Sequence, residues 1–218
     1  MFYFMTLVCD NRENIKLIGK GAYGTIFLRN NVVIKIATDA KEERTKHLDL
    51  WYSLPTSCRK YFVRPLKLPP DCKVTSKKYS LHAMEFFKGT NMHDYVILNV
   101  GLGNISLVEK ALTELKKAIL CMWKSGYIHN DLHMQNVLVS SAQKIKIIDF
   151  GLSEKVSPLK NQTSEKEISK WFSKKYVKVL KKHGFRTMNP DLYAYGVKKH
   201  RMFSKHNQKL YNVMHKIT

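Results

Sequence analysis

Three side chains with acidic or amide oxygens stand beside short apolar runs in the middle of the chain. Asp131 and Asn136 precede Val137-Leu138-Val139, and Asp149 follows Ile147-Ile148. A carboxylate can orient and deprotonate an attacking hydroxyl group, while a second carboxylate and an amide oxygen can bind the Mg²⁺ that bridges phosphates. The pattern therefore indicates phosphoryl transfer, with Asp131 as base and with Asn136 and Asp149 as metal ligands.

Glycines recur at the spacing G-x-G-x-x-G near the start of the chain, at Gly19, Gly21 and Gly24. Glycine lets backbone N–H groups approach phosphate oxygens without a clash from Cβ. A dinucleotide site would need a helix directly after the last glycine, but Thr25-Ile26-Phe27-Leu28 is typical of a strand. We therefore expect a glycine hairpin over phosphates.

A single lysine, Lys35, interrupts the apolar run Val32-Val33-Ile34-Lys35-Ile36 one hairpin later. A buried ammonium group needs an anionic partner, because burial without one is costly. Next to the glycine hairpin, this lysine is expected to neutralise the α and β phosphates of a nucleotide.

The order of these motifs resembles the eukaryotic protein kinase superfamily. The glycine loop, the strand lysine, an H-x-D-L-x-x-x-x-N loop at His129 to Asn136 and a D-F-G motif at Asp149 follow one another, and residues 191–197 are similar to the family's D-x-W-x-x-G helix segment. The resemblance covers residues 15–197. It implies ATP and Mg²⁺ as cofactors and a protein hydroxyl as acceptor.

The resemblance also implies individual residue roles. Gly19, Gly21 and Gly24 would cover the phosphates, and Lys35 would anchor them. Asp131 would be the catalytic base, Asn136 and Asp149 would hold metal, and His129 would brace the D-F-G turn. Around the adenine, Ile26 and Val33 would contact the ring, Met84 would be the gatekeeper, and Glu85, Phe86 and Phe87 would form the hinge.

Two positions of the catalytic loop depart from the family pattern. Asn130 replaces the usual arginine that reads an activation-loop phosphate, so we expect activity without that phosphorylation. His133 stands where serine/threonine kinases usually have lysine, and it is similar to the H-G-D-L-H pattern of aminoglycoside and choline kinases. We include His133 among the catalytic residues, and small-molecule phosphorylation is an alternative.

The acid that pairs with Lys35 is left open by the sequence. Glu43 has the right spacing to Leu50, yet it lies close in sequence to the lysine, and Glu42 or Asp49 are alternatives. We take Glu43 as the first choice in the nucleotide site.

The chain resembles a shortened kinase. No A-P-E segment follows Gly151, the spacing of apolar residues in 168–180 predicts an extra amphipathic helix, and few residues follow Val197. Minimal viral kinases and the Bud32-like and RIO-like atypical kinases are similar in this respect. The lysine-rich composition points to a virus.

Periodicity predicts an α+β fold with two lobes. Three antiparallel strands are expected within 15–37, a helix that starts near Thr38 and ends at Pro55, two strands at 61–68 and 79–87, and a long helix at 107–125. Residues 1–87 would form a small lobe of antiparallel sheet with one helix, and residues 88–218 a shortened, mainly helical lobe.

Composition narrows the class of protein. The net charge of +21 favours acidic proteins, nucleic acid or anionic lipid as partners, although the lysines after residue 155 are spread like a solvated face. The four cysteines form no C-x-x-C pair, which argues against a zinc knuckle or disulfide framework and favours a reducing intracellular, cytoplasmic location, in a host cell or virion if the protein is viral. The apolar residues 1–9 are too short to span a bilayer and are expected to form a capping strand.

We expect an ATP-dependent kinase that phosphorylates serine or threonine in proteins. A catalytically weak kinase-like binding protein is disfavoured because Lys35, Asp131, Asn136 and Asp149 are all present. A nucleic-acid-binding protein would explain the charge but not the ordered motifs, so nucleic acid is at most a secondary partner.

Overall fold

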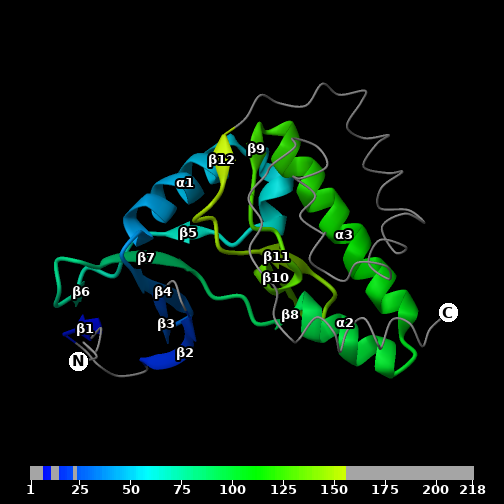
Figure 1. Ribbon diagram of the computed structural model, residues 1–218, viewed down its shortest axis with the longest axis horizontal. Helices are drawn as coiled ribbons and strands as arrows, with labels where there is room; N and C mark the ends of the chain where they lie inside the picture. Colours follow the sequence, from blue (N-terminus) through cyan, green and yellow to red (C-terminus); the bar gives the residue numbers. More distant parts are fainter. Residues whose placement is uncertain (1–6, 11–14, 22–23, 156–218) are drawn as a thin grey trace.

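A five-stranded antiparallel sheet forms the first part of the molecule (Figure 1). The computed structural model describes residues 7–10, 15–21 and 24–155. The strands lie in the order β2-β3-β4-β7-β5 and comprise Lys16–Gly21 (β2), Gly24–Arg29 (β3), Val32–Ala37 (β4), Ser80–Glu85 (β7) and Pro65–Leu66 (β5). Asn30 and Asn31 both have positive φ, 47° and 63°, which suits the tight turn between β3 and β4. The three predicted N-terminal strands are confirmed.

The register of the sheet puts the predicted nucleotide contacts on one face. Lys35 of β4 lies opposite Ile26 of β3 and His82 of β7, and Val33 lies opposite Met84. Residues directly opposite in an antiparallel pair share a face, as do residues two apart in one strand. These five side chains therefore point to the same side of the sheet.

Helix α1 (Ala40–Ser53) packs against this sheet and ends before Pro55, as predicted. Its buried residues are Ala40, Glu43, His47 and Leu50, which recur at helical spacing. Glu43 and His47 are therefore carried into the interior on the stripe that also buries Leu50.

Strands β1 (Leu7–Cys9) and β6 (Cys72–Val74) pair with each other beside the sheet. Cys9 and Cys72 pack with Ile34, whose side chain points away from the Lys35 face. The predicted capping strand is confirmed for Leu7–Cys9. Strand β6 was not predicted.

The second part of the molecule contains two helices and short strands. They are β8 (Thr90–Asn91), α2 (Met92–Gly101), α3 (Ile105–Lys124), β9 (Tyr127–Ile128), β10 (Val137–Val139), β11 (Ile145–Ile147) and β12 (Glu154–Lys155). A 3₁₀ turn, η2 (Met134–Asn136), precedes β10, and another, η1 (Thr56–Tyr61), follows α1. Helix α3 matches the predicted long helix, and its Leu115, Ile119 and Met122 are buried.

One hydrophobic cluster runs from α1 to α3. It includes Leu50 of α1, Phe62 after η1, Met84 of β7, Ile119 of α3 and Phe150. The α+β architecture with a small antiparallel sheet is as predicted. The division into lobes at residue 87 stays a prediction.

The prediction that the cysteines form no disulfides is wrong in this structure. Cys9 is joined to Cys72 and Cys58 to Cys121, each pair 63 residues apart in the sequence. The antiparallel register of β1 and β6 places the first pair opposite each other, and packing of η1 on α3 brings the second pair together. The spacing of the cysteines in the sequence does not reveal either contact. The spacing therefore no longer supports the expected reducing compartment.

The predicted strand at residues 61–68 is mostly wrong. Only Pro65–Leu66 is a strand, Tyr61 belongs to η1, and Phe62 makes an isolated bridge to Ile147. Lys146 Nζ donates to the Phe62 carbonyl, which fixes this segment without a ladder.

Several predicted features lie outside the described residues. They are the helix at residues 168–180, the helix motif at 191–197 and the lysine-rich region after 155. Within the part of the chain that is described, no helix combines the length and apolar character that a membrane span requires.

Candidate active site

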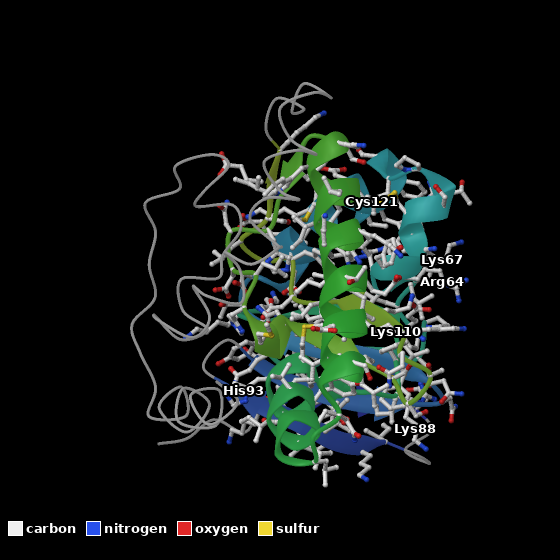
Figure 2. All side chains as sticks on the ribbon, turned by 90° about the vertical axis from the view of Figure 1, so that its right-hand side faces the viewer. Arg64, Lys67, Lys88, His93, Lys110 and Cys121 are labelled. Atoms are coloured by element: carbon white, nitrogen blue, oxygen red, sulfur yellow. A yellow bond between two sulfur atoms is a disulfide. The ribbon has the colours of Figure 1, made fainter. Side chains whose placement is uncertain are left out.

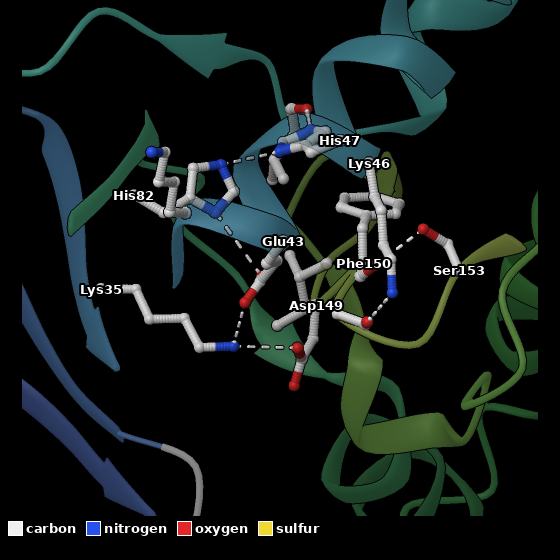
Figure 3. A network of polar contacts seen from close by, with 12 residues as sticks. Lys35, Glu43, Lys46, His47, His82, Asp149, Phe150 and Ser153 are labelled. Carbon is white, nitrogen blue, oxygen red and sulfur yellow. Dashed lines mark hydrogen bonds and ion pairs between the residues drawn. The ribbon is translucent and has the colours of Figure 1, made fainter. Parts of the chain in front are cut away.

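Lys35 lies between two carboxylates near the N-terminal end of α1 (Figure 3). Its Nζ is 2.6 Å from Glu43 Oε2 and 3.0 Å from Asp149 Oδ1. The side chains of Lys35 and Glu43 are 9% and 1% exposed, whereas that of Asp149 is 37% exposed. The arrangement joins strand β4, helix α1 and the segment after β11.

The charges of this cluster stabilise one another. Burial on its own would lower the pKa of Lys35, but Glu43 and Asp149 outweigh it and raise that pKa. Burial would likewise raise the pKa of both acids, yet the pKa of Glu43 is lowered by His82 and Lys35, and that of Asp149 by Lys35. All three groups are therefore charged at neutral pH.

The structure identifies which acid pairs with Lys35. Glu43 is the partner, as first chosen, whereas Glu42 forms an exposed pair with Lys46 at 2.8 Å and Asp49 is exposed. The helix phase explains the choice, because Glu43 shares the buried face with His47 and Glu42 points about 100° away from it.

The loop after β9 holds Asp131 by its backbone. The Asp131 carbonyl accepts hydrogen bonds from Asn136 Nδ2 and from the amide of His133, both at 2.9 Å. These two hydrogen bonds involve the backbone of Asp131, and its side chain is 20% exposed. His133 Nε2 lies 3.9 Å from Asp131 Oδ2, and His133 Nδ1 accepts from the amide of Gln135.

The loop is tied directly to the segment that carries Asp149. The amide of Ile148 donates to the Asn136 carbonyl at 3.0 Å, and His129 Nε2 donates to the Ile148 carbonyl at 3.0 Å. Asp149 has a φ of 64°, an unusual conformation for a residue with a side chain, held here by these contacts on Ile148. The bracing by His129 is as predicted.

Asn136 and Asp149 retain oxygens suited to Mg²⁺. Asn136 Nδ2 donates a hydrogen bond to the Asp131 carbonyl, so the Oδ1 atom of Asn136 is available to a metal ion. Asp149 Oδ1 accepts from Lys35 Nζ, which leaves Asp149 Oδ2 for the metal ion. Mg²⁺ is commonly held by one or two protein oxygens together with phosphate and water. Among the residues described, no three or more His, Cys, Asp or Glu side chains are grouped so that they could hold a metal ion.

Comparison with known proteins agrees with this geometry. The model of the protein kinase domain matches residues 12–215. The chain belongs to the protein kinase domain family. This membership covers the glycine hairpin, Lys35, the Asp131 loop and Asp149.

Individual relatives of this kinase domain come from distant organisms. The probable serine/threonine-protein kinase PknB of Lactococcus lactis is 34% identical over 116 residues, which are 52% of this chain and 18% of that protein. Fer-related kinase 1 of Caenorhabditis elegans is 24% identical over 84% of this chain and 46% of its own length. The serine/threonine-protein kinase sid2 of Schizosaccharomyces pombe is 30% identical over 71% of this chain and 26% of its own length. The chain thus spans less than half of each relative.

The predicted hinge of the kinase domain follows β7. Met84 is buried, and the Glu85 carboxylate accepts from the Arg64 amide and from Lys146, so this side chain is held on the β5 side. The amide of Phe86 donates to the Asn31 carbonyl at 2.9 Å. The contact of this backbone with adenine, through Glu85 and Phe87, stays a prediction.

The glycines form the predicted hairpin between β2 and β3. Gly19 pairs with Ile26 and Gly21 with Gly24. Gly24 has a φ of 150°, and a Cβ there would lie 2.3 Å from the Ile36 carbonyl oxygen, so only glycine fits. A Cβ on Gly21 would meet no described atom within 4 Å, so packing against the described residues does not require glycine there.

Two histidines in the site were not singled out from the sequence. His47 lies in the predicted helix between Thr38 and Pro55, and His82 lies in the predicted strand at residues 79–87. Both rings are 0% exposed and connect to Glu43 (Figure 3). His82 is a polar residue inside the apolar run Leu81-His82-Ala83-Met84, which is a sequence signal that could have identified it, whereas His47 stands among the polar residues of the predicted helix.

Proposed function

We propose that this chain is an ATP-dependent protein serine/threonine kinase, which transfers the γ-phosphoryl group of ATP to a protein hydroxyl group. The observation that carries the proposal is the pair of contacts from Lys35 to Glu43 and Asp149, beside a loop that presents Asp131. Membership in the protein kinase domain family and the serine/threonine kinase names of several relatives support it.

Each residue of the site would have a distinct part in the reaction. Lys35 would bind the α and β phosphates, held in place by Glu43. Asp131 would accept the proton of the attacking hydroxyl as the new P–O bond forms and the bond to the ADP oxygen breaks. Asn136 and Asp149 would hold Mg²⁺, which neutralises charge on the phosphates when bound.

The nucleotide would lie between the glycine hairpin and the Lys35 face of the sheet. Ile26 and Val33 share that face with Lys35, and Met84 closes it toward β7. A base placed there would contact apolar side chains on one side and the backbone of residues 85–87 at its edge. Gly19, Gly21 and Gly24 would bring their backbone to the phosphates.

The decisive experiment measures transfer of labelled γ-phosphate, with Mg²⁺, to casein and to myelin basic protein. An Asp131→Asn variant is the control, because it keeps the size of the side chain and removes the base. Label on protein that is lost in the variant supports the proposal. Equal labelling by both proteins would reject Asp131 as the base.

A small-molecule kinase is the second candidate, favoured by His133. This histidine lies 3.9 Å from the Asp131 carboxylate, where the resemblance to aminoglycoside and choline kinases places one. The same assay with a panel of aminoglycosides and choline separates the two. Labelling of these compounds without labelling of casein or myelin basic protein would reject the protein kinase assignment in favour of a small-molecule kinase.

The charge of the chain favours an acidic protein substrate. Arg64, Lys67, Lys88 and Lys110 are exposed on the face shown in Figure 2. Attraction between exposed charges weakens as salt is added. We therefore expect KM for casein to rise with salt more than KM for myelin basic protein, and equal salt dependence would reject this preference.

The proposal extends to location and origin. We propose an intracellular, cytoplasmic protein, in a host cell or virion if its source is a virus. Fractionation of cells that produce the protein tests the location, and recovery from the medium alone would reject it.

A further inference from the structure

Two buried histidines form a chain behind the Lys35–Glu43 pair (Figure 3). His47 Nε2 lies 2.8 Å from the Val63 carbonyl oxygen, and His47 Nδ1 lies 3.1 Å from His82 Nε2. The other nitrogen of His82, Nδ1, lies 3.6 Å from Glu43 Oε1. The chain thus runs from the backbone after η1, through α1 and β7, to the acid that holds Lys35.

The contacts of His47 fix the position of its proton. The Val63 carbonyl can only accept, so His47 Nε2 carries a hydrogen and donates it. Burial, together with the neighbouring His82, lowers the pKa of His47 to about 3, so the ring is neutral at pH 7. Its Nδ1 is then an acceptor, and His82 Nε2 must be the donor.

The remaining nitrogen of His82 faces a carboxylate oxygen. Both His82 Nδ1 and Glu43 Oε1 are buried without a hydrogen-bond partner, and 3.6 Å is slightly longer than a hydrogen bond. With a proton only on Nε2, His82 would direct a lone pair at this oxygen, which is unfavourable. A proton on Nδ1, in addition to the one on Nε2, gives an N–H that points at Glu43 and a charge-assisted contact.

We propose that His82 is a positioning residue, which holds Glu43 through an Nδ1–H directed at Oε1 and so keeps Oε2 on Lys35. The groups that face His82 are Glu43 and His47 from α1 and Lys35 from the neighbouring strand β4. The inference rests on the proposed kinase function, because it concerns how the same site is held in its working geometry.

The same chain also supports the second acid of the site. The ring of His47 stacks on Phe150, with centroids 4.3 Å apart and planes inclined by 26°. Phe150 follows Asp149, so the stack limits where the Asp149 backbone can lie. His82 and His47 therefore connect the two carboxylates on Lys35, one through an ion pair and one through an aromatic contact.

A double-mutant cycle tests the action of His82 through Glu43. We expect His82→Leu to lower kcat/KM for ATP about 10-fold in the natural chain and less than about 2-fold further in a Glu43→Gln background. His82→Gln, which keeps an N–H donor, should recover part of the loss. If His82→Leu lowers kcat/KM for ATP by the same factor in the Glu43→Gln background as in the natural chain, the proposal is overturned.

A matched control separates positioning from packing. His93 is also a buried histidine, on α2, and it does not belong to the chain of contacts formed by His47, His82 and Glu43. His93→Leu should leave kcat/KM for ATP within about 2-fold of the natural value, with thermal unfolding recorded for every variant. An equal loss of kcat/KM in His93→Leu and His82→Leu would overturn the inference.

A spectroscopic measurement tests the proton positions without turnover. In nitrogen NMR spectra of the full chain, we expect a hydrogen on Nε2 of His47 and a hydrogen on Nδ1 of His82 that is directed at Glu43. A bare Nδ1 on His82 would overturn the inference even if the protein is an active kinase. An Nδ1–H signal on His82 in a protein that transfers no phosphate would support the positioning and reject the proposed function instead.

Discussion

Replacing Glu43 by glutamine tests the buried ion pair most simply. The change keeps the size of the side chain but removes the charge that faces Lys35 at 2.6 Å. Lys35 would then keep one anionic partner, Asp149, at 3.0 Å. Because Glu43 is almost fully buried, water cannot replace the lost interaction.

The size of the effect follows from what Lys35 retains. Removing one partner of a buried ion pair typically costs about 3–5 kcal/mol, and a hydrogen bond to a charged group contributes about 1.5–3 kcal/mol. Since Asp149 still neutralises Lys35, we expect the free energy of unfolding to fall by about 2–3 kcal/mol. For a chain of this size that corresponds to a Tm lower by about 4–12 °C.

The same loss should appear in catalysis if Lys35 binds phosphates. We expect kcat/KM for ATP to fall by about 30- to 150-fold, which is 2–3 kcal/mol of transition-state stabilisation. The assays are thermal unfolding and steady-state phosphoryl transfer on purified protein.

Glu42→Gln is the matched control for Glu43→Gln. It makes the same chemical change one residue earlier, where the side chain is exposed and pairs with Lys46. We expect Tm and kcat/KM close to the natural values, because exposed pairs add little. Equal effects of the two substitutions, or an unchanged Glu43→Gln protein, would refute the assignment of Glu43.

Three further predictions follow from other parts of the structure. The pKa of His47 is lowered from 6.5 to about 3, so the free energy of unfolding is highest above pH 6.5 and should fall by up to about 5 kcal/mol as pH drops from 6.5 toward 3. In urea unfolding at several pH values, the free energy of unfolding of His47→Gln should fall less over this range than that of the natural chain. An equal fall in both proteins would contradict this. Peptide mapping without reductant should recover Cys58 linked to Cys121, and recovery of free thiols at both positions would contradict the structure. Because Asn130 replaces the phosphate-reading arginine and instead donates to the Leu152 carbonyl and Glu154, phosphatase treatment should leave kcat unchanged, and a large loss would reject this.

The pairing of the charged residues in the site could be predicted from the sequence because these residue types are rarely placed beside apolar strands without a partner. A lysine inside an apolar strand and an aspartate after one, Lys35 and Asp149, each need a partner of opposite charge, and the structure pairs them with each other. Asp131 and Asn136 were likewise predicted together, and one hydrogen bond joins them. Local pattern was enough in these cases.

Other features depend on contacts that local pattern does not encode. The choice of Glu43 over Glu42 is set by the rotation of α1 about its axis, which is fixed only when the helix packs on β7. The disulfides depend on strand register and on the packing of η1 against α3. The segment at residues 61–68 has the composition of a strand, yet most of it is held by contacts with β11 and Lys146.

The central claim is that Lys35, Asn136 and Asp149 together bind ATP with Mg²⁺. Titration calorimetry of ATP, with and without Mg²⁺, tests it on the natural chain and on Asp149→Asn. We predict that Mg²⁺ tightens ATP binding to the natural chain at least about 10-fold and that Asp149→Asn abolishes this gain. Equal tightening by Mg²⁺ in both proteins, or no ATP binding to the natural chain, would contradict it.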